Sequence, residues 1–313
     1  MRNKILSNYK NIWVAGHNGM VGSALVKRLE DINLNVLKVE KNLLDLRNQS
    51  MVDKWFFNNK PDLVFLAAAK VGGILANKEK PAEFISDNIL IQSNIINSSF
   101  KYNVEKLVFL GSSCIYPVSK YPLKESDLMN GKLEETNIAY AVAKIAGIEM
   151  CKSFNNQYKC NYISALPCNL YGPNDNFFND DSHVIPALIR KIYEAKMNNK
   201  KQCTVWGSGK PLREFLYVED LADGLIFLAD KYNDPEPINV GSGEEYTIKD
   251  IAVKISEVIG FKGNLLFDES YPDGVMRKIL DSEKIKKLGW KPKLNIDKNL
   301  QKTFDWFINN KNQ

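Results

Sequence analysis

The first 170 residues alternate between short apolar runs and longer stretches in which apolar residues recur at helical spacing. Short apolar runs of this kind are typical of strands that are buried on both faces. Buried strands that alternate with amphipathic helices form a parallel sheet with helices on both sides. The sequence therefore predicts an α/β fold with a doubly wound parallel sheet. The predicted strands are 11–15, 35–39, 62–68, 106–110 and 161–166, and the predicted helices are 21–29, 51–58, 81–100 and 140–155.

A glycine-rich turn joins the first predicted strand to the first predicted helix. Gly16, Gly19 and Gly22 follow the spacing Gly-x-x-Gly-x-x-Gly. Glycine permits a tight turn and a close approach of the backbone to a pyrophosphate, and the N-terminus of the following helix attracts anions. A plain turn also uses glycine, but the position between a strand and a helix near the N-terminus indicates a Rossmann-type dinucleotide site.

The segment after the second predicted strand bears on which dinucleotide is bound. An acid there would bind the ribose hydroxyls of NAD, whereas a cation would hold the extra phosphate of NADP. Lys38, Glu40 and Lys41 offer both, and the two lysines are equally well explained as solvated surface charges. Asp45 follows, where it either meets the adenine or caps a helix.

The pattern of apolar and polar residues changes after about residue 170. A polar loop covers 173–181, and later elements are shorter and separated by closely spaced glycines. This pattern predicts a smaller C-terminal α/β lobe, with the chain returning to the main sheet near 215–218 and 238–240. The expected division is 1–170 plus about 214–241 for the dinucleotide-binding domain, and 171–213 plus about 242–313 for the second lobe.

Composition excludes several classes of function. The net charge of +5 is spread along 313 residues without a block of five like charges, so a nucleic-acid arm is not expected. No apolar run approaches the roughly 18 residues of a membrane span, and the first residues lack the apolar core of an export signal. Five cysteines without a Cys-x-x-Cys pair predict reduced thiols in a cytoplasm, and two histidines make a histidine-based metal site improbable.

A reactive pair lies in the predicted helix 140–155. Tyr140 and Lys144 are four residues apart, so they share one face of a helix. A nearby ammonium favours the phenolate, which predicts a lowered pKa for Tyr140. The same spacing also occurs by chance on surface helices, but here it follows the glycine turn and a strand that ends at Ser112.

These features, in this order, resemble the extended, nucleotide-sugar branch of the short-chain dehydrogenase/reductase superfamily. Two further segments are similar to that branch: 166–173, with Leu166 in place of an arginine, and 213–220. Dehydratases of the branch carry Asp-Glu where this chain has Ser113 and Cys114, so the acid that expels water is missing. Four segments closely resemble the GDP-L-fucose synthases: 67–74, 111–117, 174–177 and 182–187.

The resemblance implies NADPH-dependent epimerisation at C3 and C5, and reduction at C4, of GDP-4-keto-6-deoxy-D-mannose to give GDP-L-fucose. Ser112 and Tyr140 would bind the carbonyl oxygen, with Tyr140 as proton donor, and Lys144 would bind the nicotinamide ribose. Cys114 and His183 would act on opposite faces of the sugar, because a thiol and an imidazole can both exchange protons near neutral pH. The alternatives are a small buried apolar residue for Cys114 and a helix-start residue bonded to backbone for His183.

The remaining expected site residues bind the cofactor or the sugar nucleotide. Arg213 would clamp the diphosphate from a mobile loop or make a surface ion pair, and Trp206 would stack on guanine or pack in the core. Asp273 would bind ribose or guanine, or make a turn. No metal is expected. The expected NADP-binding residues are Gly16, Asn18, Gly19, Met20, Val21, Gly22, Lys38, Asp45, Ala68, Leu110, Gly111, Tyr140, Lys144, Pro167, Asn169, Leu170 and His183. The expected substrate-binding residues are Asn169, Lys191, Trp206, Arg213 and Asp273, with Lys191 standing where relatives often have arginine.

Three further expectations remain open at this point. The resemblance implies a homodimer with a contact through the helices after Pro81 and Tyr140. A first alternative function keeps C4 reduction and lacks epimerisation, with a related GDP-4-keto sugar such as a 6-deoxy-heptose as substrate. A second is a non-catalytic dinucleotide sensor that binds protein partners, although a sensor has no need of Ser112, Tyr140 and Lys144 together.

Overall fold

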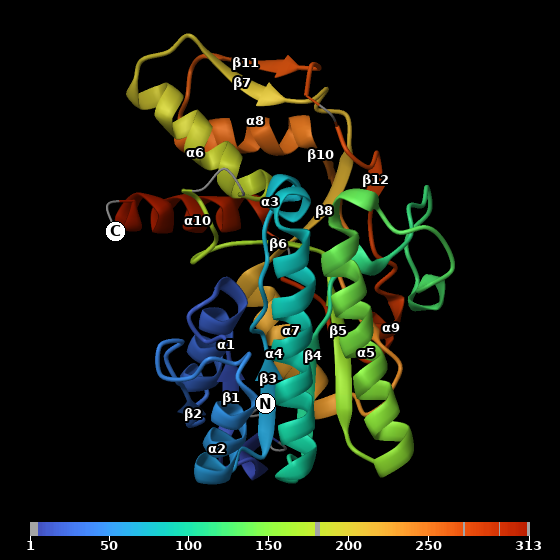
Figure 1. Ribbon diagram of the computed structural model, residues 1–313. Helices are drawn as coiled ribbons and strands as arrows, with labels where there is room; N and C mark the ends of the chain where they lie inside the picture. Colours follow the sequence, from blue (N-terminus) through green and yellow to red (C-terminus); the bar gives the residue numbers. More distant parts are fainter. Residues whose placement is uncertain (1–5, 179–181, 272, 294, 312–313) are drawn as a thin grey trace.

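The chain is built around a six-stranded parallel sheet (Figure 1). The computed structural model describes residues 6–178, 182–271, 273–293 and 295–311. The strand order is β2-β1-β3-β4-β5-β9, and every neighbouring pair is parallel. The strands are β1 (Ile12–Ala15), β2 (Val36–Leu37), β3 (Leu63–Leu66), β4 (Lys106–Leu110), β5 (Tyr162–Pro167) and β9 (Ile238–Val240).

Helices pack against this sheet in two groups. The helix α1 (Met20–Asp31) packs against α7 (Val218–Lys231), whereas α2 (Gln49–Asn59), α4 (Pro81–Lys101) and α5 (Ile138–Tyr158) pack against one another in sequence. The strands β1, β3, β4 and β5 are buried along their whole length, as their apolar runs predict. The doubly wound fold predicted from the sequence is confirmed.

Shorter elements of the second half form a separate assembly above the sheet in Figure 1. The strand β8 (Leu212–Tyr217) lies between β10 (Glu245–Thr247) and β12 (Arg277–Lys278), and β6 (Asn169–Tyr171) also pairs with it. A two-stranded parallel sheet joins β7 (Gln202–Trp206) to β11 (Asn264–Asp268). The accompanying helices are α6 (Val184–Met197), α8 (Ile248–Ile259) and α10 (Ile296–Asn310). Two further helices are short: α3 (Ile74–Glu79), in the first half of the chain, and α9 (Glu283–Lys287).

The prediction that 215–218 returns to the main sheet is wrong, while 238–240 does join it as β9. The side chains of β8 alternate between two hydrophobic clusters. Phe215 and Tyr217 pack in a cluster with α6, α8 and α10, whereas Leu216 packs in the cluster around the main sheet. Residues 215–217 are apolar on both faces because each face packs against a different cluster. This pattern resembles that of a strand in the main sheet, but β8 pairs with short strands outside it.

Candidate active site

The glycine turn lies against the end of β3. Gly16 has a φ of +88°, and a Cβ there would lie 2.7 Å from the backbone N and Cα of Ala68. A Cβ on Gly22 would lie 1.9 Å from the Gly16 carbonyl oxygen. Both positions thus require glycine. The turn is followed directly by α1, and Gly19 is the N-cap residue of that helix. The close-packed turn and the first N–H groups of α1 together form a cradle suited to a pyrophosphate.

An acid stands beside the turn on the β2 side. The Glu40 carboxylate lies 3.3 Å from His17 Nε2 and accepts a hydrogen bond of 2.8 Å from Asn18 Nδ2. Lys38 Nζ donates a hydrogen bond of 2.8 Å to Glu30. A cavity of about 360 Å³ adjoins these residues, and its lining includes His17, Asn18, Ser23, Lys27, Glu30 and Lys38.

Asp45 does not cap a helix. Asn48 caps α2, since its side chain accepts a hydrogen bond of 3.1 Å from the Met51 N–H. The Asp45 carboxylate instead accepts from the backbone N–H and the guanidinium of Arg47, with distances of 2.9 and 3.0 Å. These hydrogen bonds hold the pKa of Asp45 down at about 2. Of the two predictions made for Asp45, only a contact with adenine is left.

Three of the predicted reactive residues meet at the end of β4. The hydroxyl of Tyr140 is hydrogen-bonded to Ser112, and Lys144 Nζ donates a hydrogen bond of 2.7 Å to the Leu110 carbonyl oxygen. Ser112 begins a 3-10 turn, η2 (Ser113–Ile115), and its Oγ accepts a hydrogen bond of 3.2 Å from the Cys114 N–H. The helix α5 places Tyr140 and Lys144 on one face, as their spacing predicts.

Burial controls the protonation of this group. Desolvation raises the pKa of Tyr140, with a further rise from Cys114 and an opposing effect from the hydrogen bond with Ser112. Desolvation also lowers the pKa of Lys144 to about 7. The prediction that Lys144 lowers the Tyr140 pKa is therefore wrong in this structure. An ammonium that is itself close to neutralisation exerts little pull on the phenol, which stays protonated at neutral pH.

Cys114 is half-buried and lies in η2, beside the Ser112–Tyr140 pair. Its Sγ accepts a hydrogen bond of 3.3 Å from Nζ of Lys278 in β12. Sequence reasoning did not find Lys278, because a two-residue strand has no periodicity and the two residues are 164 positions apart. The other half-buried cysteine is Cys160, whereas Cys151, Cys168 and Cys203 are buried.

His183 is the residue before the first turn of α6, but its side chain makes no capping hydrogen bond. The residue is exposed as a whole. The protein around the ring lowers its pKa by desolvation, and the positive charge of Lys278 adds to that effect. Lys278 thus interacts with both His183 and Cys114.

Arg213 lies within the strand β8 and not in the mobile loop that we expected. Its Nη1 donates a hydrogen bond of 2.9 Å to the Leu212 carbonyl oxygen. Burial lowers its pKa, and the charges of Asp273 and Cys114 oppose this. Arg213 and Lys278 are direct neighbours in the parallel register of β8 and β12, so their side chains share one face of the sheet.

Trp206 is 52% exposed, which excludes the core-packing alternative. One face of its indole stacks on Tyr271, with ring centroids 4.5 Å apart and planes 8° apart. Lys191 Nζ lies 3.6 Å from the ring centroid of Trp206. Asp273 accepts hydrogen bonds of 2.7 and 2.6 Å from the backbone N–H and the hydroxyl of Ser208. It therefore ties the loop after β7 to the segment after β11.

The other predicted cofactor residues lie at the carboxyl edge of the sheet. Pro167 ends β5, and Asn169 and Leu170 lie in β6. The Asn169 amide donates a hydrogen bond of 2.9 Å to the Glu214 carbonyl oxygen. Gly111 follows β4 so closely packed that a Cβ would lie 2.4 Å from Leu166 Cδ2. Met20 and Val21 are the first two residues of α1.

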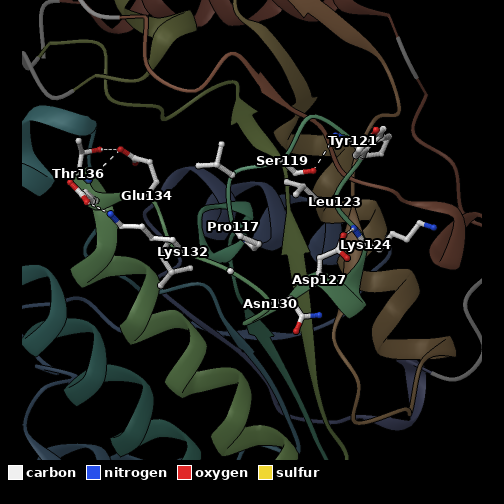
Figure 2. A pocket seen from close by; sticks show the side chains of 15 residues that line it. Pro117, Ser119, Tyr121, Leu123, Lys124, Asp127, Asn130, Lys132, Glu134 and Thr136 are labelled. Carbon is white, nitrogen blue, oxygen red and sulfur yellow. Dashed lines mark hydrogen bonds and ion pairs between the residues drawn. The ribbon is translucent and has the colours of Figure 1, made fainter.

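A larger cavity of about 900 Å³ lies within the loop 117–136 (Figure 2). Its lining mixes apolar side chains such as Pro117 and Leu123 with charged ones such as Lys132 and Glu134. Its lining residues lie between Pro117 and Thr136, so Ser112, Cys114 and Tyr140 are not among them. This cavity is therefore separate from the cluster at the end of β4.

The NAD dependent epimerase/dehydratase family matches residues 12–241. The chain belongs to this family. Among proteins of the family, GDP-L-fucose synthase 1 of Arabidopsis thaliana is 50% identical over 96% of this chain and 93% of that protein. A GDP-6-OMe-4-keto-L-xylo-heptose reductase from C. jejuni has a similar structure, with a TM-score of 0.90 and 36% identity over 96% of this chain and 98% of that one. A GDP-L-fucose synthetase from Naegleria fowleri bound to NADP has a TM-score of 0.90 and 29% identity over 97% and 95% of the two chains.

The residues that the structure describes, 6–178, 182–271, 273–293 and 295–311, contain neither a membrane-spanning helix nor a metal-binding cluster. No helix there is long and apolar enough to cross a membrane. No group of three or more histidine, cysteine or acidic side chains in that part of the chain could hold a metal ion.

Proposed function

We propose that this chain is an NADPH-dependent enzyme that epimerises C3 and C5 and reduces C4 of GDP-4-keto-6-deoxy-D-mannose, giving GDP-L-fucose. The relative from Arabidopsis thaliana, half identical over nearly the whole chain, supports this substrate and product. The observation that carries the epimerase step is the position of Cys114. Its sulfur lies beside the Ser112–Tyr140 pair, where a carbonyl oxygen would be bound.

The chemistry of the ketone explains why a base belongs beside that pair. A 4-keto group acidifies the protons on C3 and C5, so one base removes either proton if the ring shifts slightly. In our proposal Cys114 takes the proton, the electron pair moves into the enolate, and Ser112 and Tyr140 hydrogen-bond the enolate oxygen. His183 returns a proton to the opposite face of the same carbon, which inverts it.

The reduction uses the same oxygen site. In this proposal the glycine cradle holds the pyrophosphate of NADPH, and Lys144 bonds a ribose hydroxyl through its Nζ. NADPH, when bound, supplies the hydride that C4 accepts. Tyr140 gives its proton to the oxygen, which suits a phenol that burial keeps protonated at neutral pH.

The sugar nucleotide is proposed to lie between the two assemblies. Arg213 would pair with the diphosphate through its planar guanidinium, and Asn169 would contact the sugar. Trp206 would stack on the guanine with Lys191 beside it, which its exposure supports. Because Tyr271 stacks on one face of the indole and Lys191 Nζ lies 3.6 Å from the ring centroid, the base would displace one of these two side chains. Asp273 would support this end through Ser208.

The division into domains and the assembly are also proposals. The proposed division is a dinucleotide-binding domain of 1–170 plus about 214–241, and a nucleotide-sugar lobe of 171–213 plus about 242–313. Two hydrophobic clusters support it in part, since Leu280, Ile285 and Trp290 pack in the first cluster while Phe215 and Tyr217 pack in the second. Exposed apolar residues on the two long helices support a homodimer through α4 and α5: Ile89, Leu90, Phe100, Val142 and Tyr158. The free cysteines support a cytoplasmic location.

Solvent exchange tests the epimerase step apart from reduction. In D2O without NADPH, the wild-type protein should place deuterium at C3 and C5 of the 4-keto substrate, as read by NMR. Cys114→Ser should slow this exchange by about 100-fold or more, because serine is a far weaker base at neutral pH. Cys160→Ser, which changes the other half-buried cysteine, should leave the exchange unchanged.

The similar structure of a heptose reductase from C. jejuni keeps a second candidate in view, a GDP-4-keto-sugar reductase without epimerase activity. Consumption of NADPH with a 4-keto sugar nucleotide, but no exchange at C3 or C5 by the wild-type protein, would establish that reductase. Binding of NADPH without turnover of any 4-keto sugar nucleotide would instead support a dinucleotide sensor.

A further inference from the structure

Lys278 contacts the sulfur of Cys114, and no role for it was predicted from the sequence. Its Nζ lies 3.3 Å from Sγ, within hydrogen-bonding distance for sulfur. Lys278 is half-buried, so water only partly screens its charge. The contact therefore pairs a strong hydrogen-bond donor with the thiol proposed to act as the epimerase base.

The position of Lys278 is set by the backbone of β12. Lys278 pairs with Arg213 of β8. Two residues later, the Leu280 N–H donates a hydrogen bond of 2.8 Å to the carboxylate of Glu214, and the preceding Ile279 carbonyl accepts one of 2.9 Å from the Leu123 N–H. Glu214 is fully buried and also accepts from the Gly243 N–H at 2.7 Å. Lys278 is thus presented to Cys114 by a segment fixed on both sides.

Other titratable groups face the same small region. Tyr140 and Arg213 both interact with the charge of Cys114, from α5 and β8. Lys278 also acts on His183 at the start of α6 and on the buried Cys168 after β5. Arg213 and Lys278 are therefore two positive charges that face the sulfur, and Lys278 is in contact with it.

We propose that Lys278 is a positioning residue for the epimerase step: its ammonium hydrogen-bonds the Cys114 sulfur, orients it toward the sugar and stabilises the negative charge that the sulfur carries when it acts as the base. This inference rests on the proposed function for the identity of the reaction. When the S–H bond breaks, the proton passes to water at the mouth of the site and the ammonium keeps its three protons. The thiolate then takes the proton from C3 or C5, which forms a new S–H bond and the enolate.

The same charge serves the second half of the inversion. A positive neighbour makes the imidazolium of His183 readier to give up its proton, and the pKa of His183 is lowered partly by Lys278. One ammonium thus favours a base on one face of the sugar and a proton donor on the other. Removal of Lys278 should weaken both half-steps, whereas the hydride-accepting carbon remains held by Ser112 and Tyr140.

Alkylation of Cys114 tests the inference without any sugar substrate. Iodoacetamide is uncharged, so the lysine cannot steer it electrostatically, and it reacts with the thiolate rather than the thiol. Rates would be measured from pH 6 to 9.5 by mass spectrometry of the peptide that contains Cys114, with the Cys160 peptide of the same digest as internal reference. Lys278→Met should slow alkylation of Cys114 at pH 7 by about tenfold and move its pH profile upward, and Lys278→Arg should restore most of the rate.

Two controls separate the contact from a general effect. Lys287→Met removes the same charge from an exposed residue of α9 and should leave the profile of Cys114 unchanged. Lys278→Gln provides a polar variant of similar length, so that a folding defect of the methionine variant does not decide the outcome. Each variant would first be checked by circular dichroism and NADPH binding.

With the 4-keto sugar nucleotide, Lys278→Met should lower kcat for exchange at C3 and C5 by about tenfold while KM changes little, and Lys278→Arg should rescue it. An unchanged alkylation profile in both Lys278→Met and Lys278→Gln would overturn the inference, even if the wild-type protein epimerises. Slower alkylation in those variants, combined with a wild-type protein that exchanges no sugar protons, would support the Lys278–Cys114 contact and refute the proposed function.

Discussion

Two neighbouring regions of the site handle charge in opposite ways. At the end of β4, burial raises the pKa of Tyr140 and brings that of Lys144 down to about 7, so both groups are held at or near neutrality. On the strands β8 and β12, Arg213 and Lys278 lie side by side. The first region is interlocked by hydrogen bonds through Ser112 and the Leu110 carbonyl, whereas the second presents cations toward a shared space.

This difference indicates a division of labour. A neutral, desolvated cluster suits proton transfer at a carbonyl, because its hydrogen bonds act in a medium of low polarity. A paired set of cations, with an exposed indole nearby, suits the binding of an anionic nucleotide. Changes in the first region should therefore alter kcat, and changes at Arg213 or Trp206 should mainly alter KM. Lys278 is the exception in the second region, because it contacts Cys114 and should alter kcat of the epimerase step. Cys114 lies where the two regions meet, which makes it sensitive to both.

Tyr140→Phe is the strongest test of the neutral cluster. It removes the phenolic proton while the ring stays, so it should lower kcat for NADPH-dependent reduction by about 1000-fold with little change in the KM of the sugar nucleotide. Stopped-flow absorbance of NADPH would measure it. Exchange at C3 and C5 should fall less, since Ser112 still bonds the oxygen. An equal loss in both reactions would mean that the cluster is not specialised for reduction.

The pH dependence of stability tests whether burial really neutralises Lys144. Its folded pKa is about 7, against about 10.5 in the unfolded chain, so the unfolded state binds more protons between those values. Stability contributed by Lys144 should therefore rise with pH across this window, by up to about 1.4 kcal/mol per unit. Below pH 7 both states are protonated and the full penalty remains.

Urea unfolding of wild type and Lys144→Met from pH 7 to 9.5 would measure the effect. Lys106, whose pKa burial lowers to about 8, acts in the same direction in both proteins, so only the difference between the two curves reports Lys144. The free energy of unfolding of wild type should increase relative to that of Lys144→Met as the pH rises. Parallel curves would show that Lys144 keeps its charge in the folded protein, and the contrast between the two regions would fail.

The sequence predicted the elements of the first region well, and its chemistry less well. Short apolar runs and the glycine turn specify β1, β3 and β4 locally, so their positions were recognisable. The direction of the Tyr140 pKa was not, because residue spacing along a helix reports neighbours and not burial. Desolvation outweighed the charge of Lys144 and changed the sign of the shift.

For the second region, the sequence allowed Arg213 and Trp206 to be predicted as binding residues, but it did not predict which side chains contact one another. Lys278 lies in a two-residue strand, and Tyr271 reaches Trp206 across 65 positions. Neither contact has a periodic signature. Residues 215–217 of β8 are apolar on both faces because they separate two clusters, which made this segment look like a strand of the main sheet. Such long-range pairings are set by the packing of short elements, which composition does not specify.

Trp206→Ala is the smallest of the expected effects and tests the binding region directly. The indole is half exposed and stacks on Tyr271, so its removal deletes a stacking surface without opening the core. Loss of one aromatic contact, worth about 0.5–1.5 kcal/mol, should raise the Kd of GDP and the KM of the sugar nucleotide by about fivefold. Titration of GDP by calorimetry would measure the first. Because Trp206 lies outside the neutral cluster, kcat should not change.

Tyr271→Ala is the matched variant. If it weakens GDP binding as much, the stacked pair binds as a unit, and if it tightens binding, Tyr271 competes with the base for the indole. A fall in kcat with either variant would mean that the two regions are coupled.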